Sequence, residues 1–396
     1  MPSRPNLSRF VLVTLLVTSC SVAEVAPTTS TTTSTVPTTT TLPATTSTIP
    51  PVTITGAPPE LTAAVEAFYR FVSAEATVVP RAPEPVLATI TPSPVETPRT
   101  GVASVATFYH QQIATVEMGG DLFLAIDDGS GWRFAGGDWP SVGVPAYFGS
   151  TPKLVAVIGS DARPGEDITR KLGDSIHIVA LDGSGGGGVA GIPRDSYVPI
   201  PGIGRRKITS ALSRGGPPLM MDTLRGLTGL GFDGYVVTGF VGFQEMLGTI
   251  LGGVNLMVPY PIYDSAAGAA LEPGEQYLSG PAALSFARAR KSLSGGDLTR
   301  SLHQGMILIA AAKGVRAGGY GVIPGLMEMS EPWMATDLSA EHLLTFSALA
   351  LRADLDNMVN VVAPGSPGWA GGASVVFLHD SATQLWEDLA DGRIGS

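Results

Sequence analysis

Charged side chains suited to binding a phosphate and a divalent cation gather in two blocks of the sequence. The first block consists of residues at the ends of apolar runs: Asp161, Arg163, Asp174, Arg194 and Asp195. The second block contains Arg288, Arg290, Asp297, Arg300 and Gln304. Guanidinium groups match phosphate oxygens, and hard divalent cations take carboxylate oxygens. The two blocks therefore predict a site for a metal-bound pyrophosphate.

The spacing of these residues also leaves a second interpretation open, in which they form surface ion pairs or hold loops in place. Arg288 and Arg290 would point about 200° apart on a continuous helix, so both can face one site only if the helix ends there. The glycine-containing stretch 292–296 is consistent with such an ending. Arg300 and Gln304 are four residues apart, which places them on one face of the following helix.

Other familiar catalytic motifs are missing from the sequence. There is no G-x-S-x-G, no H-E-x-x-H and no G-x-x-x-x-G-K-[ST], and the five histidines show no metal-ligand spacing. The glycine run 183–188 resembles a phosphate-binding loop in composition only, because no lysine follows it and it leads into a predicted strand. We interpret it as a hairpin loop.

From Pro152 onward, predicted strands alternate with predicted helices, which indicates a sheet with helices packed on it. We expect strands over residues 154–159, 175–181, 189–192, 235–240, 254–258, 360–363 and 374–378. We expect helices over 217–229, 243–251, 281–289 and 298–315, and two later helices with Ser339 and Ser381 as N-caps. The charged blocks then lie at strand ends, where α/β sheets place ligands.

The first residues of the chain have the pattern of an export signal. Arg4 and Arg9 precede the apolar run 10–17, and the only cysteine, Cys20, follows Val17-Thr18-Ser19. This run is shorter than the roughly 20 residues that span a bilayer. We interpret 1–20 as a lipoprotein signal peptide with lipidation at Cys20, the alternative being a plain secretory signal. Two acyl chains at this position would anchor the protein stably to the outer face of the cell membrane.

Residues 21–59 are dominated by threonine, serine and proline, which predicts a disordered tether. Residues 60–149 predict a small α+β domain of unknown function. Within it we expect helices over 60–76 and 102–116, a proline-rich segment between them, and a hairpin over 121–134. Residues 150–396 form the remaining domain, whose motifs lie within 152–315. The net charge of −10 argues against general nucleic-acid binding.

The stretch from Leu154 to Val315 resembles the LytR-CpsA-Psr family in an ordered series of motifs. They are Gly-Ser-Asp-x-Arg at 159–163, Ile-Pro-Arg-Asp at 192–195, Lys-Ile-Thr-Ser-Ala at 207–211, Leu-Gly-Gly-Val at 251–254 and Leu-Glu-Pro-Gly at 271–274. The series continues with Leu-Ser-Gly-Pro-Ala-Ala-Leu at 278–284, Arg-x-Arg at 288–290 and Asp-x-x-Arg at 297–300, with a glutamine four residues later. Such a series is far more specific than any single motif.

The resemblance implies an α/β (α+β) fold, a central mixed β-sheet flanked by helices. It implies transfer of a phosphoglycan from a polyprenyl pyrophosphate carrier to a peptidoglycan hydroxyl, with Mg²⁺ or Mn²⁺ held by Asp161 and Asp174. Pyrophosphate would bind Arg194, Arg288, Arg290 and Gln304, and Asp161, Asp174 and Arg194 would be catalytic. Arg163, Asp195, Asp297 and Arg300 would support the site, and the apolar residues of the strands and of 240–251 would line a tunnel for the lipid tail.

Two positions depart from the usual family pattern. Leu172 stands where an arginine commonly precedes the second metal aspartate, and His303 stands where an arginine often precedes the glutamine. Both changes remove fixed positive charge and so bear on pyrophosphate affinity. Two other functions stay open from the sequence: a hydrolase that only cleaves the lipid pyrophosphate, and a non-catalytic lipid or glycan binder.

Overall fold

The computed structural model describes residues 51–92, 94, 99–291 and 293–395. The predicted signal peptide, Cys20 and all but the last residues of the predicted tether lie outside this part. Contacts group the described residues into one compact unit. No single helix there is long and apolar enough to cross a membrane; Asp297–Gly318 with Tyr320–Trp333 meets that test only as a pair bent by 105°.

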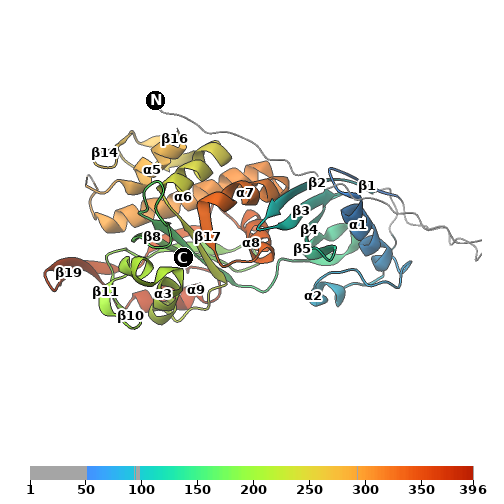
Figure 1. Cartoon of the computed structure of the whole chain (residues 1–396), viewed down its shortest axis with the longest axis horizontal. Helices are drawn as coiled ribbons and strands as arrows, with labels where there is room; N and C mark the ends of the chain where they lie inside the picture. Colours follow the sequence, from blue (N-terminus) through green and yellow to red (C-terminus); the bar gives the residue numbers. More distant parts are fainter. Residues whose placement is uncertain (1–50, 93, 95–98, 292, 396) are drawn as a thin grey trace, which may run out of the picture. The chain divides into compact units, whose positions relative to one another are not determined.

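The N-terminal part is a six-stranded sheet in sequential order (Figure 1). Its strands are β1 (Val52–Thr55), β2 (Arg99–Phe108), β3 (Gln111–Met118), β4 (Asp121–Asp127), β5 (Trp132–Trp139) and β6 (Val144–Tyr147). The helices α1 (Pro59–Val72) and α2 (Glu84–Leu87) and the short 3₁₀ helix η1 (Pro140–Val142) accompany them. On α1, Phe68 and Tyr69 are fully buried against Phe123, and Phe68 stacks on Trp139.

Two predictions for this part were wrong. The tether does not reach Pro59, because Val52–Thr55 pairs in parallel with β2. The predicted helix over 102–116 is a β-hairpin, in which β2 and β3 turn through Tyr109 and His110 at φ 42° and 66°. A left-handed turn at two non-glycine residues lacks the Asn-Gly signal of a hairpin, so the hairpin could not be recognised from the sequence. The helix over 60–76 and the hairpin over 121–134 are confirmed.

The main sheet has six strands in the order β17-β12-β7-β8-β9-β18 and is mixed, as expected. The strands are β7 (Lys153–Ser160), β8 (Gly173–Leu181), β9 (Gly187–Gly191), β12 (Gly234–Thr238), β17 (Met334–Thr336) and β18 (Val359–Val362). β12 runs parallel to β7 and β18 parallel to β9, whereas β8 is antiparallel to both of its neighbours. The glycine run 183–188 connects β8 and β9 as the predicted hairpin.

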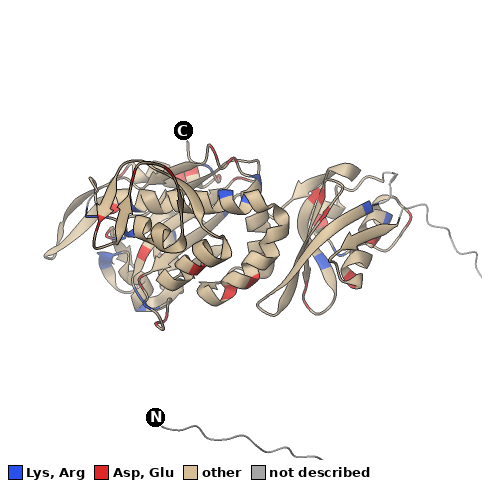
Figure 2. Ribbon diagram, turned by 90° about the horizontal axis from the view of Figure 1, so that it is seen from above, with Lys and Arg blue, Asp and Glu red and all other residues tan. Residues whose placement is uncertain are grey.

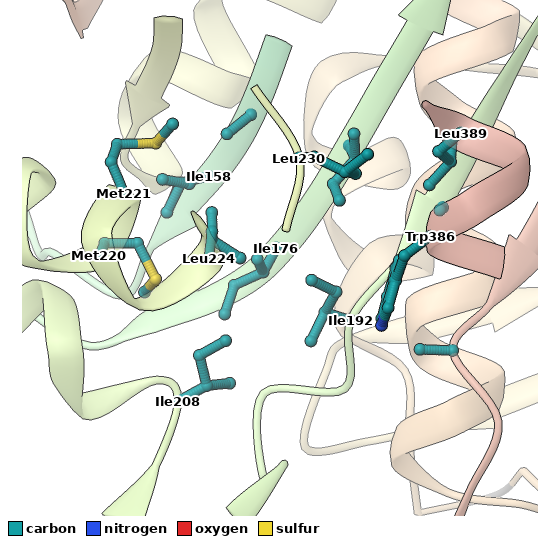
Figure 3. Packing of buried hydrophobic residues seen from close by; sticks show 14 of the residues in the cluster. Ile158, Ile176, Ile192, Ile208, Met220, Met221, Leu224, Leu230, Trp386 and Leu389 are labelled. Atoms are coloured by element: carbon teal, nitrogen blue, oxygen red, sulfur yellow. The ribbon is translucent and has the colours of Figure 1, made fainter. Parts of the chain in front are cut away.

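One face of this sheet packs against α3 (Ser210–Thr228) and α9 (Ala382–Leu389). Ile158 and Ile176 of the sheet meet Leu224 of α3 and Trp386 of α9 in this core (Figure 3). The helix α3 begins at Ser210 and not at the predicted Pro217. Gly216, at φ 71°, breaks the helix, so the proline pair begins only its second segment.

Helices on the other side of the sheet enclose the functional site. They are α4 (Phe240–Gln244), the π-helical η2 (Glu245–Ile250), α5 (Gly280–Arg288), α6 (Asp297–Gly318), α7 (Ile323–Ser330) and α8 (Ala340–Arg352), with the 3₁₀ turns η3 (Tyr320–Val322) and η4 (Glu331–Trp333). Four two-stranded ribbons complete the described fold. They are formed by β10 (Tyr197–Ile200) with β11 (Gly204–Lys207), β13 (Val254–Val258) with β16 (Gly274–Leu278), β14 (Ile262–Asp264) with β15 (Ala269–Leu271), and β19 (Gly365–Ala370) with β20 (Ala373–Leu378).

The small sheet and the helices share one hydrophobic cluster. Phe108 and Leu124 of the small sheet belong to the same buried group as Ile323 of α7 and Leu344 of α8. Glu328 accepts a hydrogen bond from the backbone N–H of Thr107 at 3.0 Å. The predicted boundary at residues 149 and 150 thus separates two sheets that have a core in common.

Candidate functional site

An apolar cavity of about 370 Å³ lies between the main sheet and the helices α4 to α8. Its wall carries the predicted site residues Asp174, Arg288, Arg300 and Gln304 together with Ser160 and Ser175. The rest of the lining is almost entirely apolar and includes Val157, Val236, Phe240, Phe243, Met246, Leu247, Ile307, Leu308, Met327, Leu343 and Leu351. The cavity therefore combines a hydrocarbon-lined interior with a small set of charged and polar groups.

The local fold explains how the charged residues reach this cavity. Asp174 lies at a register shift between β7 and β8. Gly159 pairs with Ser175 and Ser160 pairs with Gly173, so Asp174 between them has no pairing partner on β7. Arg288 is the last residue of α5, and the chain extends at Ala289 with ψ 131°, as the arginine spacing predicted. Gln304 lies one turn after Arg300 on α6 and donates to the carbonyl oxygen of Ala287 at 3.1 Å.

Arg194 links two acidic side chains at the polar end of the cavity. Its Nη1 donates to Oδ2 of Asp174 at 2.5 Å, and its Nε lies 3.7 Å from Oδ1 of Asp297. Burial lowers the pKa of Arg194, but the carboxylates of Asp174, Asp297 and Asp195 outweigh burial and leave it raised. Arg300 forms an ion pair with Asp297, and burial lowers the pKa of its guanidinium. These arginines are thus held in place by carboxylates before any ligand binds.

Arg288 is placed differently from Arg194. Its guanidinium lies 4.9 Å from the ring centroid of Phe240, and that of Arg163 lies 5.7 Å from the same ring. Among the residues that the structure describes, no carboxylate oxygen lies within ion-pair distance of Arg288. A cation on an aromatic ring and without a carboxylate keeps its N–H donors available for an anion.

Six predicted site residues are not part of the cavity wall: Asp161, Arg163, Arg194, Asp195, Arg290 and Asp297. Asp195 is mostly buried and binds Lys207 Nζ at 2.9 Å, with Nη2 of Arg290 at 3.9 Å. The backbone N–H groups of Arg290 and Lys291 both donate to Oδ2 of Asp264 at 2.8 Å. This carboxylate fixes the chain directly after Arg288, a role that the sequence did not reveal. The guanidinium of Arg290 therefore lies near the carboxylate of Asp195 and does not line the cavity.

The two aspartates proposed to hold a metal have free oxygen atoms of the right kind. Oδ1 of Asp174 is buried and has no hydrogen-bond partner within the described residues, and the same holds for Oγ of Ser160. Asp161 accepts a hydrogen bond at Oδ1 from the N–H of Leu172, 2.9 Å away. Mg²⁺ commonly binds one or two carboxylates and completes its shell with water and phosphate oxygens. The residues fit that ion, although the described chain has no group of three or more His, Cys, Asp or Glu side chains placed to hold a metal.

The two positions that depart from the family pattern are uncharged in the structure. Leu172 is partly exposed and contacts Asp161 through its backbone. His303 is buried, stacks on Phe286 at 4.4 Å and lies 2.9 Å from the hydroxyl oxygen of Tyr260 through Nε2. Burial lowers the pKa of His303 to about 4, so this side chain is neutral at physiological pH.

Sequence reasoning missed three features of the site. Arg300 was predicted as a supporting residue, yet it lies in the cavity wall. Phe240 was predicted as tunnel lining only, yet it also holds Arg288. Ser175 in the cavity wall lies 3.1 Å from Nδ1 of His177, whose Nε2 is 2.9 Å from the carbonyl oxygen of Ser301. None of these has a sequence signal, because each depends on which side chain faces the cavity.

Figure 2 shows that most positions along the ribbon carry neither a basic nor an acidic residue. This distribution agrees with a cavity whose lining is apolar except for the groups named above. A hydrophobic cavity with few convergent polar groups is typical of a ligand site. The ligand expected from this lining has a long apolar part and an anionic head.

The profile of the LytR_cpsA_psr family matches residues 148–391. The chain is 37% identical over 161 residues to a probable cell wall biosynthesis protein, LcpB of Corynebacterium glutamicum, covering 37% of this chain and 38% of LcpB. It is 32% identical over 222 residues to the polyisoprenyl-teichoic acid–peptidoglycan teichoic acid transferase TagV of Bacillus subtilis, covering 54% and 56% of the two chains. The chain thus spans less than two thirds of the length of these relatives.

Solved structures show the same fold. The crystal structure of Bacillus subtilis TagV superposes with a TM-score of 0.53 at 23% identity, over 61% of this chain and 96% of TagV. TagT bound to LIIa-WTA superposes with a TM-score of 0.52 at 22% identity, over 62% of this chain and 92% of TagT. At this level of identity the likeness establishes the mixed α/β architecture.

Proposed function

Because the chain belongs to the LytR_cpsA_psr family, we propose that it transfers a phosphate-linked glycan from a polyprenyl pyrophosphate carrier to a hydroxyl of peptidoglycan. The observation that supports this proposal most strongly is the apolar cavity that carries Asp174, Arg288, Arg300 and Gln304 in its wall. A polyprenyl pyrophosphate has both the apolar tail and the anionic head that such a lining would bind. TagV, to which the chain is similar, is a teichoic acid transferase and so of the same functional class.

In the proposed reaction the acceptor hydroxyl oxygen attacks the glycan-proximal phosphorus. A new phosphorus–oxygen bond forms, the bond to the bridging oxygen breaks, and the polyprenyl phosphate leaves with the electron pair. Arg288 and Gln304 would position the pyrophosphate, and Arg194 would orient Asp174 through their hydrogen bond. Positioning and charge stabilisation account for most of the catalysis in such phosphoryl transfers.

A Mg²⁺ or Mn²⁺ ion held by Asp161 and Asp174 would supply further neutralisation of the phosphate charge. Asp161 and Asp195 are the two carboxylates proposed as acceptors of the hydroxyl proton. Of these, Asp195 forms an ion pair with Lys207 at 2.9 Å. Arg163 would support the site through Phe240 and Asp297 through Arg300, both of which line the cavity, whereas Asp195 would support it as the sequence neighbour of Arg194.

A non-catalytic binder is a second candidate, and the uncharged Leu172 and neutral His303 are the observations that favour it. Such a protein would bind the lipid without turnover. A lipid pyrophosphate hydrolase differs in another way, because it would release the glycan phosphate without consuming an acceptor.

The first prediction tests the site with the full chain, Mg²⁺, a polyprenyl pyrophosphate glycan and a peptidoglycan acceptor. Asp174→Asn should remove both metal binding and transfer, because it deletes the carboxylate with the free buried oxygen. Arg288→Ala should weaken lipid pyrophosphate binding about 30-fold and leave metal affinity nearly unchanged, as expected for the loss of a charge-assisted hydrogen bond. Product formation, metal titration and lipid binding are measured in parallel.

Arg225→Ala is the matched control, because Arg225 pairs only with Asp222 on the surface of α3. Transfer that survives Asp174→Asn and Arg288→Ala would contradict the site assignment. Leu172→Arg tests the binder directly, since it restores the missing charge. Lipid binding without turnover in both the unchanged protein and Leu172→Arg would favour the binder.

The second prediction concerns anchoring, which we propose on the basis of Cys20. Changing Cys20 to Ser should release the protein from membranes or block processing of the signal peptide, because lipid attachment needs the thiol. Membrane fractionation and electrophoretic mobility measure the outcome. If the variant partitions into membranes like the unchanged protein, the lipoprotein proposal is wrong.

A further inference from the structure

A second cavity, of about 520 Å³, lies between strand β2 of the small sheet and the helices α6 and α7. Four residues line both this cavity and the first one: Ile250, Leu251, Val315 and Leu326. The two spaces therefore adjoin each other across a single layer of apolar side chains. Side chains in such a layer change rotamers far more readily than packed backbone moves.

Glycines keep the second cavity open. Gly314 of α6 and Gly325 of α7 line it, and a Cβ atom added at either would meet nothing within 4 Å. The small sheet closes the opposite side, where Ser104 and Val105 of β2 line the cavity. The N–H of Gly321 donates to Oε1 of Glu117 on β3 at 3.1 Å, which holds the corner between α6 and α7 against the small sheet.

The lining of the second cavity suits hydrocarbon and not a charged ligand. It contains Val105, Val322, Leu326, the exposed Met329 and four glycines, with Ser104 as its polar side chain, and no Lys, Arg, Asp or Glu among the described residues. In the first cavity, the charged lining residues are Asp174, Arg288 and Arg300. A ligand with its anionic head at Arg288 therefore meets no further charged lining residue on the way from there to the second cavity.

Resting on the proposed function, we propose that the distal isoprene units of the carrier lipid extend from the first cavity into the second. Strand β2 of the small sheet then forms part of the binding site for the end of the tail. The continuity of the two apolar linings and the empty space at Gly314 and Gly325 support this occupant. The small sheet would thereby contribute to selection of long-chain carriers.

A photocrosslinking experiment with the full chain and Mg²⁺ tests where the tail ends. Farnesyl pyrophosphate and decaprenyl pyrophosphate each carry a photoreactive group at the end of the tail, and mass spectrometry maps the labelled residues. The short probe should label the first cavity, for example at Leu343 or Leu351, whereas the long probe should label Ser104, Val105 or Met329. A long probe that labels only the first cavity would overturn the inference while leaving the proposed function in place. If neither probe labels the first cavity, the proposed function fails as well.

A substitution experiment tests the same inference by filling the space. Gly314→Leu combined with Gly325→Leu should weaken binding of decaprenyl pyrophosphate about tenfold, because several methylene groups lose their buried site, and should leave farnesyl pyrophosphate binding unchanged. Gly226→Leu on α3 is the matched control, since it is also a helical glycine with no neighbour within 4 Å of an added Cβ. Unchanged decaprenyl binding in the double variant, or an equal loss for both lipids, would contradict a role specific to the end of the tail.

Discussion

At the scale of single residues, two arginines at the polar end of the cavity are held by a carboxylate that both of them contact. Arg194 bridges Asp174 and Asp297, and Arg300 binds the same Asp297. Buried charges need partners of this kind, because an unpaired one carries the full desolvation penalty. Arg288 is the exception, held by Phe240 and without a carboxylate among the described residues. A bound pyrophosphate would supply the partner that it lacks.

His177 gives a pH-dependent prediction at the same scale. It is fully buried, and burial lowers its pKa from 6.5 to about 4. Below pH 6.5 the unfolded chain therefore binds a proton at this position and the folded chain does not until about pH 4. The free energy of unfolding should fall as pH falls through this window, by on the order of 3 kcal/mol, and level off below it.

The measurement is urea unfolding of the protein and of His177→Gln across that pH range. The variant should lose this part of the pH dependence, while the parts due to other groups remain. His342→Gln serves as control, because His342 is exposed on α8. An unchanged pH dependence in His177→Gln would show that His177 does not titrate as a buried neutral side chain.

At the scale of the element, two predicted N-caps give a matched pair. Oγ of Ser339 accepts a hydrogen bond from the N–H of His342 at 3.2 Å, so this cap is confirmed. Ser381 is the N-cap residue of α9, as predicted, but it has helical conformation and its side chain makes no capping hydrogen bond. A capping side chain satisfies an N–H that the helix leaves free, and Ser381 does not reach one.

Ser339→Ala should accordingly lower the free energy of unfolding by about 1 kcal/mol, and Ser381→Ala should leave it nearly unchanged. Thermal or urea unfolding of both variants measures the difference. Equal effects of the two substitutions would mean that the bond to His342 contributes nothing to stability.

At the scale of the whole molecule, the small sheet and the helices α7 and α8 stabilise each other. Phe108 and Leu124 are buried in the cluster that also holds Ile323 and Leu344. A fragment of residues 149–396 loses the small sheet and exposes that cluster, as well as the second cavity. Exposed apolar surface of this kind lowers solubility and stability.

We therefore expect the fragment 149–396 to bind an apolar dye and to melt at a lower temperature than the chain from Ser47 to Ser396. Dye fluorescence and circular dichroism measure the two effects. If the shorter fragment melts at the same temperature and binds no dye, the small sheet is an independent domain.

The sequence by itself determined the family, the mixed α/β fold and most of the regular elements of the main sheet. The alternating run 254–258 is a local signal of a strand, and it agrees with β13. The predicted helices 281–289 and 298–315 likewise agree with α5 and α6. The order of the motifs identified the family, and the profile match over residues 148–391 confirms it.

Only the tertiary structure decided which side chains meet. The sequence predicted Arg290 as a pyrophosphate ligand and Arg300 as a supporting residue, yet Arg300 lines the cavity and Arg290 reaches Asp195. The turn at Tyr109 likewise has a distant partner, because the N–H of Tyr109 donates to Oε2 of Glu331 at 3.0 Å. Local sequence encodes periodicity and capping, whereas register, burial and charge pairing depend on residues far apart in the chain. For that reason the shared core of the small sheet and the adjoining cavities appear only in the folded chain.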